Sequence, residues 1–319
     1  MKAVIYEKYG PPEVLKIQEV EKPAIKENEV LVKVFAVAVT VGDVRLRKAD
    51  PFMARTFNGL FKPKRKILGM NFAGMIEDTG SRVKQFREGE KVFGSTAFDF
   101  GSYAEYLTIK EDGVIAHIPP DTSYEEAAVV PFGALTSLHF LRKGNIGKGK
   151  KVLIYGASGS LGTAGVQLAV NFGAEVTGVC GTTNIELVKS LGAEKVIDYT
   201  KESIKDTNES YDIIYDAVGK SPFSECIKSL KNDGYYLRSV HMGIIPIARG
   251  LWTKMTSNKK IVGGISVERQ EDLRFLAKMM EENKFKPVID KVYPINEISE
   301  AHRYVDQGHK KGNVAVTIQ

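Results

Sequence analysis

The sequence predicts an α/β protein composed of a barrel-like domain of short strands and a domain built on a doubly wound parallel sheet. Three observations lead to this prediction. The first 120 residues contain many short strand-like segments separated by glycines and prolines, a pattern typical of β barrels. From residue 151 onward, strand-like segments alternate with helical ones, as in βαβ units with a parallel sheet. A loop of small residues joins the first of these strands to a helix.

The composition is that of an ordinary soluble globular protein with room for two cores. The chain has 319 residues, of which 43% are apolar and 26% are charged. No apolar run approaches the roughly 18 residues needed to cross a bilayer, so we expect no membrane partner. The two cysteines, Cys180 and Cys226, lack metal-binding spacing, and the start Met1–Glu7 becomes charged too early for a signal peptide. We therefore expect a reduced, cytoplasmic location.

Basic residues occur in clusters, which together with the net charge of +6 raise the question of a nucleic-acid partner. No nucleic-acid recognition motif accompanies them, so solvated loops are the favoured interpretation. One cluster could instead lie at the entry for an anionic cofactor. The clusters are Arg45, Arg47 and Lys48; Lys62, Lys64, Arg65 and Lys66; and Lys148, Lys150 and Lys151.

The first domain is predicted to span residues 1–122 and to be completed by residues 268–319. Its strand-like segments are rich in β-branched and aromatic residues. The tail has helical segments at about 270–283 and 297–307, and it ends in a strand-like segment that we expect to return to this domain. The predicted strands are Ala3–Ile5, Val14–Ile17, Val30–Val37, Phe72–Glu77, Lys91–Gly94, Tyr103–Ile109, Lys291–Tyr293 and Asn313–Ile318.

The second domain is predicted to span residues 123–267. Pro119 and Pro120 break the chain before it, and Ser123 with Glu126 three residues later has the spacing of a capping box at a helix start. The strands that alternate with helices in this domain are Val152–Tyr155, Val176–Cys180, Val196–Tyr199, Tyr211–Ala217 and Gly234–Val240.

The segment Val152–Gly162 passes from an apolar strand into a loop of small residues and then into a helix. This arrangement presents backbone N–H groups and the positive end of a helix dipole to a phosphate. Ala157, Gly159 and Gly162 follow the dinucleotide-binding fingerprint, with alanine in place of its first glycine. We therefore predict a dinucleotide site rather than a plain glycine turn. Its predicted loop ligands are Ser158, Gly159, Ser160, Leu161 and Gly162.

The end of the next strand indicates which cofactor is used. An acidic residue there would bind the adenosine ribose 2′-hydroxyl and repel a 2′-phosphate. After Cys180 this chain has Gly181, Thr182, Thr183 and Asn184, which leave room for a 2′-phosphate but bring no Arg or Lys to it. We therefore predict NADPH rather than NADH, with Thr182 and Thr183 at the phosphate.

These motifs, in this order, resemble the medium-chain dehydrogenase/reductase superfamily, and within it the zinc-free quinone oxidoreductase group. The resemblance implies a GroES-like β-barrel domain interrupted by a Rossmann domain, with the active site in the cleft between them. It also implies a homodimer formed through an edge strand of the Rossmann sheet, here residues 260–265. The similar stretches are Met1–Pro12, Leu68–Gly74, Gly101–Tyr106, Glu126–Ala128 with Pro131, Leu135 and Thr136, the fingerprint loop, Ser190–Ala193 leading to Val196–Tyr199, Tyr211–Gly219 and Gly312–Ile318.

The departures from zinc-dependent relatives concern the metal ligands. Those relatives have a cysteine where this chain has Thr40, three residues before the aspartate that matches Asp43. Their Gly-His-Glu is here Gly69-Met70-Asn71, and their four-cysteine zinc lobe is missing. A hydroxyl, a thioether and an amide do not make a zinc site, so we predict no metal cofactor.

The resemblance implies further site residues. Thr40 and Asn71 are the candidate catalytic residues, as hydrogen-bond donors to the oxygen that gains charge, although local turn or core hydrogen bonding explains them equally well. Thr136 resembles a threonine that faces the nicotinamide, or it bonds within its own helix. Tyr199 resembles a tyrosine beside the adenine-end phosphate, or it packs at the edge of the core. The other implied cofactor-binding residues are Val218 and Asn313, the latter at a position where the family often has lysine.

Taken together, the motifs and the resemblance predict a zinc-independent, NADPH-dependent reductase that transfers hydride to quinones, enones or 2-alkenals. The alternative is a family member that keeps the cofactor-binding fold and acts as a nucleic-acid or protein-interaction module. A zinc alcohol dehydrogenase is disfavoured, because the residues at the ligand positions are wrong for zinc.

Overall fold

The computed structural model describes residues 1–239 and 257–318. The chain forms two compact units. Residues 1–132 and 268–319 together form the first unit, and residues 133–267 form the second. Each unit has its own main sheet and its own hydrophobic core.

The first unit is built around a seven-stranded sheet and a separate two-stranded ribbon, β1-β2. Its strands are β1 (Lys2–Ile5), β2 (Lys16–Glu19), β3 (Glu29–Val39), β4 (Asn71–Thr79), β5 (Lys91–Ser95), β6 (Tyr106–Lys110), β7 (Val114–His117), β14 (Ile289–Pro294) and β15 (Asn313–Thr317). Its helices are α1 (Val41–Lys48), α2 (Arg55–Asn58), α3 (Tyr124–Ala128), α9 (Gln270–Glu281) and α10 (Ile298–Asp306).

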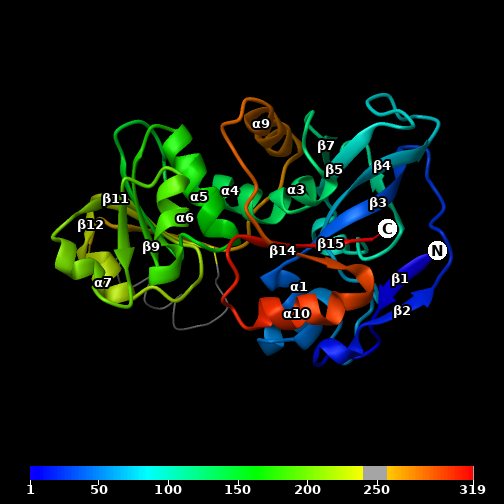
Figure 1. The fold of residues 1–319 in the computed structure, drawn as a ribbon, viewed down its shortest axis with the longest axis horizontal. Helices are drawn as coiled ribbons and strands as arrows, with labels where there is room; N and C mark the ends of the chain where they lie inside the picture. The colour runs from blue at the N-terminus through cyan, green and yellow to red at the C-terminus, as the bar shows by residue number, and fades with distance from the viewer. Residues whose placement is uncertain (240–256, 319) are drawn as a thin grey trace. The chain divides into compact units, whose positions relative to one another are not determined.

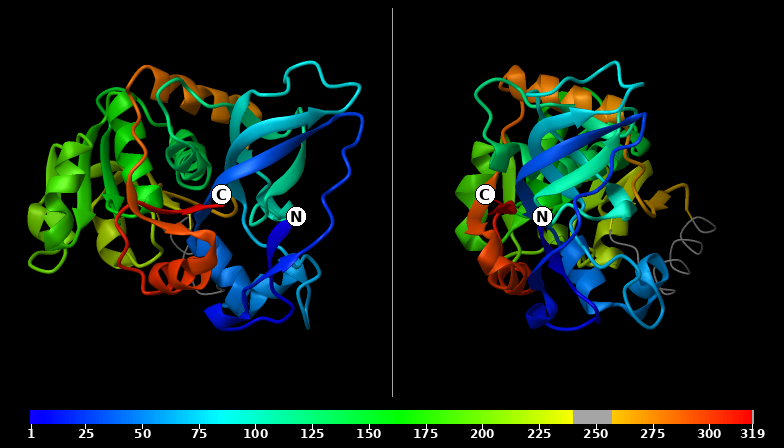
Figure 2. Two further views of the ribbon diagram at one scale, coloured as in Figure 1. Left: turned by 45° about the vertical axis from the view of Figure 1, so that its right-hand side comes forward. Right: turned by 90° about the vertical axis from the view of Figure 1, so that its right-hand side faces the viewer.

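Strand β3 is the centre of this sheet. The strand order is β14-β15-β3-β4-β5-β7, and β6 also pairs with β3. The long strand β3 can serve three partners because β6 pairs with its first half and β15 with its second. The expected return of the last strand is confirmed, since β15 runs antiparallel to β3 with Val316 opposite Val37 (Figure 2).

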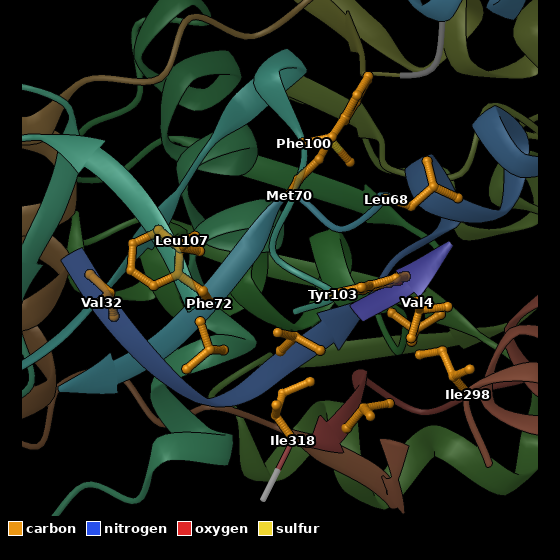
Figure 3. Packing of buried hydrophobic residues seen from close by; sticks show 14 of the residues in the cluster. Val4, Val32, Leu68, Met70, Phe72, Phe100, Tyr103, Leu107, Ile298 and Ile318 are labelled. Atoms are coloured by element: carbon orange, nitrogen blue, oxygen red, sulfur yellow. The ribbon is translucent and has the colours of Figure 1, made fainter. Parts of the chain in front are cut away.

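The core of the first unit gathers side chains from segments far apart in the sequence. Figure 3 shows Val4 of β1, Phe72 of β4 and Ile298 of α10 as members of one cluster of side chains, and all three are buried. Phe72 and Tyr103 are completely inaccessible to solvent. Burial of such large apolar groups is the main force that holds these strands together. Further members of this cluster are Val32, Val37, Leu68, Met70, Ile76, Phe100, Leu107, Val316 and Ile318.

The first unit extends to Phe132, further than the predicted boundary after residue 122. Helix α3 begins with the predicted capping box: Ser123 Oγ accepts from the Glu126 N–H at 3.1 Å, and Glu126 accepts from the Ser123 N–H at 2.9 Å. The helix then packs against β3, β4 and β15, and the ring of Tyr124 stacks on Phe35 with 4.6 Å between centroids. Residues 123–132 belong with the first unit because their side chains pack there.

The second unit contains one six-stranded parallel sheet with the order β10-β9-β8-β11-β12-β13. The predicted strand 234–240 begins earlier in the structure, and Val240 lies outside the described residues. The strands are β8 (Lys151–Tyr155), β9 (Glu175–Cys180), β10 (Lys195–Asp198), β11 (Tyr211–Asp216), β12 (Leu230–Arg238) and β13 (Lys260–Gly263). The helices are α4 (Thr136–Lys143), α5 (Ser160–Asn171), α6 (Ile185–Ser190) and α7 (Phe223–Lys228).

The strand order reverses at β8. From β8 the chain proceeds in one direction through β9 and β10, and then in the other through β11, β12 and β13. Because crossovers between parallel strands are right-handed, α5 and α6 cover one face of the sheet and α7 covers the other (Figure 1). This is the predicted doubly wound arrangement. It places the glycine-rich loop after β8 at the switch point, where such sheets bind their ligands.

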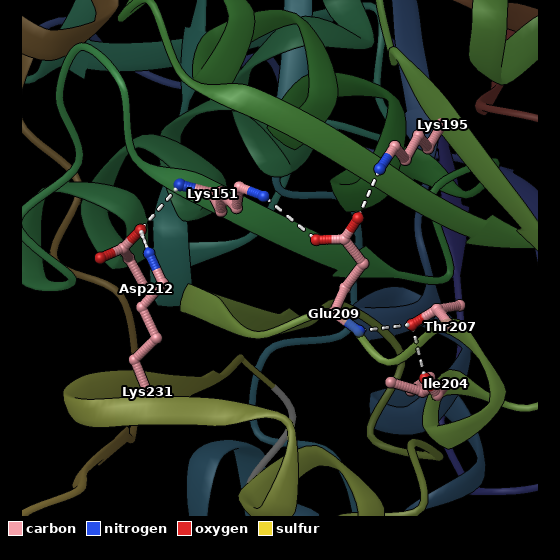
Figure 4. A network of polar contacts seen from close by, with 7 residues as sticks. All are labelled: Lys151, Lys195, Ile204, Thr207, Glu209, Asp212 and Lys231. Atoms are coloured by element: carbon pink, nitrogen blue, oxygen red, sulfur yellow. Dashed lines mark hydrogen bonds and ion pairs between the residues drawn. The ribbon is translucent and has the colours of Figure 1, made fainter.

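The amino ends of these strands carry a network of ion pairs (Figure 4). Lys151 Nζ lies 3.1 Å from a carboxylate oxygen of Glu209, which also contacts Lys195, and these lysines hold the pKa of Glu209 below its ordinary value. Asp212 accepts from the Lys151 backbone N–H and from Lys231 Nζ, both at 2.9 Å. Partly exposed pairs of this kind each contribute little stability. The network lies at the amino ends of the strands. The glycine-rich loop lies at their other end, because it follows the carboxyl end of β8.

The helices of both units are short. The longest described ones, α5 and α9, have 12 residues each. Within the described parts of the chain, no helix combines the length and the apolar character needed to cross a bilayer.

The first prediction concerns the core of the first unit. Phe72→Ala removes a fully buried ring from the middle of the sheet, so we expect it to lower the free energy of unfolding by about 3–5 kcal/mol. Phe61→Ala is the matched control, because that ring is 87% exposed and its loss should change stability by less than about 0.5 kcal/mol. Urea unfolding followed by circular dichroism measures both. Equal effects of the two substitutions would show that Phe72 does not stabilise this core.

Candidate active site

The glycine-rich loop between β8 and α5 is held in place by backbone hydrogen bonds. Gly156 has a φ of +80°, a conformation that glycine adopts without the strain of a side chain. The N–H groups of Gly156 and Ala157 both donate to the Val179 carbonyl in β9, at 3.0 and 2.9 Å. The loop is therefore fixed by two neighbouring strands of the sheet.

The two glycines of the fingerprint, Gly159 and Gly162, serve different purposes. A Cβ atom added at Gly162 would lie 2.0 Å from the Gly156 carbonyl oxygen, so a glycine is needed for α5 to pack this closely. A Cβ atom added at Gly159 would be 3.6 Å from that oxygen, with nothing nearer among the described residues. Gly159 occupies the N-cap of α5. It has no side chain that could accept hydrogen bonds from the first N–H groups of the helix. The open N-terminus of this helix fits a phosphate group.

Helix α4 anchors the first turn of α5. Ser137 donates its hydroxyl to the Leu161 carbonyl at 2.8 Å and lies 3.2 Å from the Tyr215 hydroxyl. Burial raises the pKa of Tyr215 to about 12, so this tyrosine is neutral. The neighbouring Thr136 is buried, and its hydroxyl lies 3.3 Å from Ser266 Oγ, in the segment after β13. Thr136 is thus directed at that segment and not at its own helix.

Val218 packs directly against the loop. Its Cγ1 would be 2.5 Å from a Cβ atom at Gly156. Asp216 at the end of β11 sets the path of this segment, because its carboxylate accepts from the Gly219 N–H at 2.7 Å and from the Ser221 hydroxyl at 2.9 Å. Sequence reasoning missed Asp216, although a carboxylate at the carboxyl end of a parallel strand, two residues before Val218, was visible.

An aspartate from the next strand lies beside the residues after β9. Asp198, the last residue of β10, accepts hydrogen bonds from the hydroxyls of Thr182 at 2.5 Å and Thr200 at 2.7 Å. The bonds from Thr182 and Thr200 hold the pKa of Asp198 down to about 2. Because the hydroxyl hydrogen of Thr182 is directed at Asp198, it cannot donate to a phosphate in the same arrangement. Sequence reasoning missed this contact because the two residues are 16 positions apart.

Other predicted cofactor residues lie near this loop. Thr183 is exposed, and Tyr199 is 57% exposed. The Tyr199 hydroxyl would be 3.4 Å from a Cβ atom at Gly181. The Asn184 amide donates to Ser158 Oγ at 3.2 Å, which connects the loop after β9 with the glycine-rich loop. The second unit therefore brings together most of the predicted cofactor residues.

Asn313 belongs to the first unit, where it starts β15. Its backbone N–H and its side-chain amide both donate to the Val288 carbonyl, at 2.9 and 3.0 Å. These bonds fix the approach of the chain to β15. In this arrangement the Asn313 side-chain amide is bonded to the backbone of its own unit, at Val288.

Thr40 is the N-cap of α1 in the first unit, and it is bonded to Asp43. The Thr40 hydroxyl donates to Asp43 Oδ2 at 2.6 Å, the Thr40 N–H donates to the same oxygen at 2.9 Å, and the Asp43 N–H donates to Thr40 Oγ1 at 3.2 Å. The pair forms a capping box at the start of the helix. Both side chains are buried, and Asp43 is completely inaccessible to solvent.

Burial changes the titration of the groups around Asp43. Desolvation raises the pKa of Asp43 to about 6, because a carboxylate in a low-dielectric interior loses its hydration. Burial, with the nearby Asp43 charge, also raises the pKa of Tyr103 well above its ordinary value. His302 Nε2 lies 3.2 Å from the Tyr103 hydroxyl, and burial lowers the pKa of His302 to about 3. Tyr103 and His302 are therefore both neutral.

Asn71 has buried polar atoms without partners. It begins β4, opposite Ser95 of β5, and is only 1% exposed. Neither its amide oxygen nor its amide nitrogen has a hydrogen-bond partner among the described residues. Glu268 Oε2 is likewise buried without a partner in the described chain, and burial raises the pKa of Glu268, opposed by a bond from Ser95. Each unpaired group costs about 1–3 kcal/mol, so such groups point to a site that a ligand completes.

The residues at the former metal positions do not supply zinc ligands. Thr40 offers a hydroxyl that is bonded to Asp43, Met70 a thioether, and Asn71 an amide. In residues 1–239 and 257–318, no three His, Cys, Asp or Glu side chains are grouped so that they could hold a metal ion. A hydroxyl, a thioether and an amide are poor ligands for zinc, and the absence of a metal cofactor stays a prediction.

Parts of the chain match two known protein families. Residues 26–120 match the alcohol dehydrogenase GroES-like domain, and residues 191–316 match the zinc-binding dehydrogenase family. These matches cover the strands β3 to β7 and the segment from the end of α6 to β15.

Individual proteins are similar over nearly the whole chain. A 2-methylene-furan-3-one reductase of Solanum lycopersicum is 34% identical over 328 residues, which are 99% of this chain and 79% of that protein. A chloroplastic NADPH-dependent alkenal/one oxidoreductase of Arabidopsis thaliana is 31% identical with the same coverage. The structure of the quinone oxidoreductase from Coxiella burnetii superimposes with a TM-score of 0.89 and 28% identity, covering 100% of this chain and 99% of that one. This chain belongs to the quinone oxidoreductase-like group of the medium-chain dehydrogenase/reductase superfamily.

The second prediction tests the glycine-rich loop. Gly159→Val should abolish binding of NADPH, because the branched side chain would occupy the open space at the start of α5, where an added Cβ lies no nearer than 3.6 Å to any described atom outside its own chain neighbours. Gly162→Ala is the contrasting variant, since its Cβ would lie 2.0 Å from the Gly156 oxygen and should destabilise the fold itself. Titration calorimetry and thermal unfolding separate the two effects. NADPH affinity within twofold of wild type in Gly159→Val would refute the assignment of this loop.

Proposed function

We propose that this protein is a zinc-independent, NADPH-dependent reductase that transfers hydride to quinones, enones or 2-alkenals. The observation that carries the proposal is the loop between β8 and α5, where Gly162 permits close packing and Gly159 leaves the helix N-terminus open. Its fit to a dinucleotide phosphate is supported by the relatives, two of which bear the names of an NADPH-dependent alkenal/one oxidoreductase and a quinone oxidoreductase.

The residues of the first unit suit an acceptor whose reduced form spreads its charge. A bound nicotinamide cofactor supplies the hydride. Reduction of a plain ketone concentrates charge on one oxygen, which zinc normally stabilises as a Lewis acid. Addition to an enone or a quinone gives a delocalised anion, for which a few hydrogen-bond donors suffice. We assign this role to Thr40 and Asn71, and Asn71 has buried amide hydrogens without a partner in the described chain.

The choice of NADPH rests on the segment 181–184, which carries no acidic side chain. Asp198 lies close by, but the residue is only 5% exposed and its carboxylate already accepts bonds from Thr182 and Thr200. The exposed side chains of Thr183 and Tyr199 remain for a 2′-phosphate. We therefore assign phosphate recognition to these two residues rather than to Thr182.

We also propose that the protein forms a homodimer through β13. This strand stands at the edge of the six-stranded sheet, with β12 as its partner in the described chain. An edge strand presents backbone N–H and C=O groups that a second copy can pair with.

The third prediction concerns the preference between cofactors. NADPH should bind more tightly than NADH by about 1–2 kcal/mol, the contribution of one or two additional hydrogen bonds. Thr183→Asp should reverse the preference by repelling the 2′-phosphate, whereas Thr183→Asn, which is similar in shape but neutral, should not. Position 183 is chosen because an aspartate at 182 would face Asp198 and perturb the fold. Calorimetry with both cofactors is the measurement, and equal wild-type affinities would contradict the NADPH assignment.

The fourth prediction joins metal content to substrate class. Purified protein should contain no stoichiometric zinc by elemental analysis, and chelators should leave the reduction of enones unchanged. At the acidic end of the assay range, Thr40→Val should lower kcat about tenfold while changing KM less, because a donor to the developing charge contributes about 1–1.5 kcal/mol in the transition state. Thr56→Val, at an exposed helix position, is the control and should retain full activity. Zinc-dependent oxidation of simple alcohols at a comparable rate would overturn the proposed chemistry.

A further inference from the structure

The hydrogen bond from Thr40 to Asp43 conflicts with a role for Thr40 as a donor to substrate. A threonine hydroxyl has a single hydrogen to donate. In the structure that hydrogen is directed at Asp43 Oδ2, at an oxygen–oxygen distance of 2.6 Å. A bond of this length to a carboxylate is charge-assisted and about twice as strong as a neutral one. While Asp43 is ionised, Thr40 can therefore accept a hydrogen bond but has none to give.

The two oxygens of Asp43 differ. Oδ2 accepts from both the hydroxyl and the N–H of Thr40. Oδ1 is buried and has no hydrogen-bond partner of good geometry among the described residues, although the Gly69 N–H and the Tyr103 hydroxyl both act on the Asp43 carboxyl. A proton on Asp43 would therefore reside on Oδ1, and Oδ2 would become the carbonyl oxygen of a neutral acid.

None of the groups that act on the Asp43 carboxyl in the described chain is a cation. Tyr6 and Tyr103 face it, and burial keeps both neutral by raising their pKa values. His302 contacts Tyr103, and its pKa is lowered to about 3, so it is neutral as well. Arg47, on the same helix as Asp43, pairs with Asp306 at 3.4 Å. These surroundings disfavour a carboxylate, and the pKa of Asp43 rises to about 6, within the range in which enzymes are assayed.

We propose that Asp43 is a positioning residue that controls whether Thr40 donates its hydrogen bond to the substrate oxygen. Ionised Asp43 retains the Thr40 hydroxyl hydrogen. Neutral Asp43 holds it weakly and releases it to the oxygen that gains charge as hydride is added. The proposal rests on the proposed function, because it assigns the pH dependence of that reaction to one buried carboxyl group.

The test is the pH profile of enone reduction, measured as initial rates of NADPH oxidation between pH 5.5 and 8.5. Wild-type kcat should fall about tenfold as pH rises through the Asp43 pKa, the loss expected for one hydrogen bond. At high pH it should level off near the rate of Thr40→Val, which lacks the donor at every pH. Asp43→Asn should show no such fall, because its amide is neutral throughout and offers a carbonyl oxygen to the Thr40 N–H.

Two further variants guard against a merely structural effect. Thr40→Ser keeps the hydroxyl and the cap, so it should retain the wild-type pH dependence. Asp206→Asn alters the equivalent carboxylate of the Ser203–Asp206 capping box in the second unit and should leave the profile unchanged. If Asp43→Asn keeps the wild-type fall, or Asp206→Asn removes it, the proposal is overturned.

Unfolding experiments give a readout that does not depend on activity. Because the folded-state pKa of Asp43 is raised, its stabilising effect is complete below the unfolded-state pKa of about 4 and is lost as pH rises through about 6. The urea midpoint of wild type should therefore fall relative to that of Asp43→Asn between pH 4 and 7. A constant difference would overturn the proposal. Wild-type protein that oxidises no NADPH with any acceptor would instead refute the proposed function, and this proposal with it.

Discussion

The close approach between Gly162 and the Gly156 carbonyl is the constraint on which the candidate cofactor site depends. No side chain fits between them, since a Cβ atom would lie 2.0 Å from that oxygen. The first turn of α5 is thus pressed against the end of β8, and the N–H bonds of Gly156 and Ala157 to Val179 fix the loop on its other side. The direction of the helix N-terminus, and of the dipole that attracts a phosphate, follows from this packing.

Local patterns in the sequence were sufficient to predict the two sheets. The alternation of strands and helices beyond residue 151 gave the doubly wound sheet, and the apolar segment near the C-terminus gave the strand that returns to β3. The extent of the first unit was misjudged, because Pro119 and Pro120 look like a domain boundary. Whether helix α3 packs on one core or another depends on contacts such as Tyr124 on Phe35, and no local pattern encodes that choice.

The same difference between local patterns and long-range contacts applies to the candidate site. Gly159, Gly162 and Thr40 could be singled out because their significance lies in short-range spacing or in a family motif. The partners that decide what Thr40 and Thr182 can do are Asp43 and Asp198. In the sequence, Asp43 serves only to align Thr40 with the cysteine of zinc-dependent relatives. Its importance comes from burial, which makes its charge costly and which the residue type does not reveal. Asp198 was missed, because strand pairing brings β10 beside the segment after β9.

The paired strands β3 and β15 are synthesised at very different times, because they lie far apart in the chain. Val316 lies opposite Val37, 279 positions later in the chain, whereas all the described strands of the second unit fall within residues 133–267. At a translation rate of about 5–20 residues per second, roughly 15–60 s pass between the synthesis of β3 and that of β15. On the ribosome the second unit can complete its sheet first. The unit that carries Thr40 and Asn71 exposes an unpaired strand edge until the tail is synthesised, and such an edge is a template for pairing with another chain.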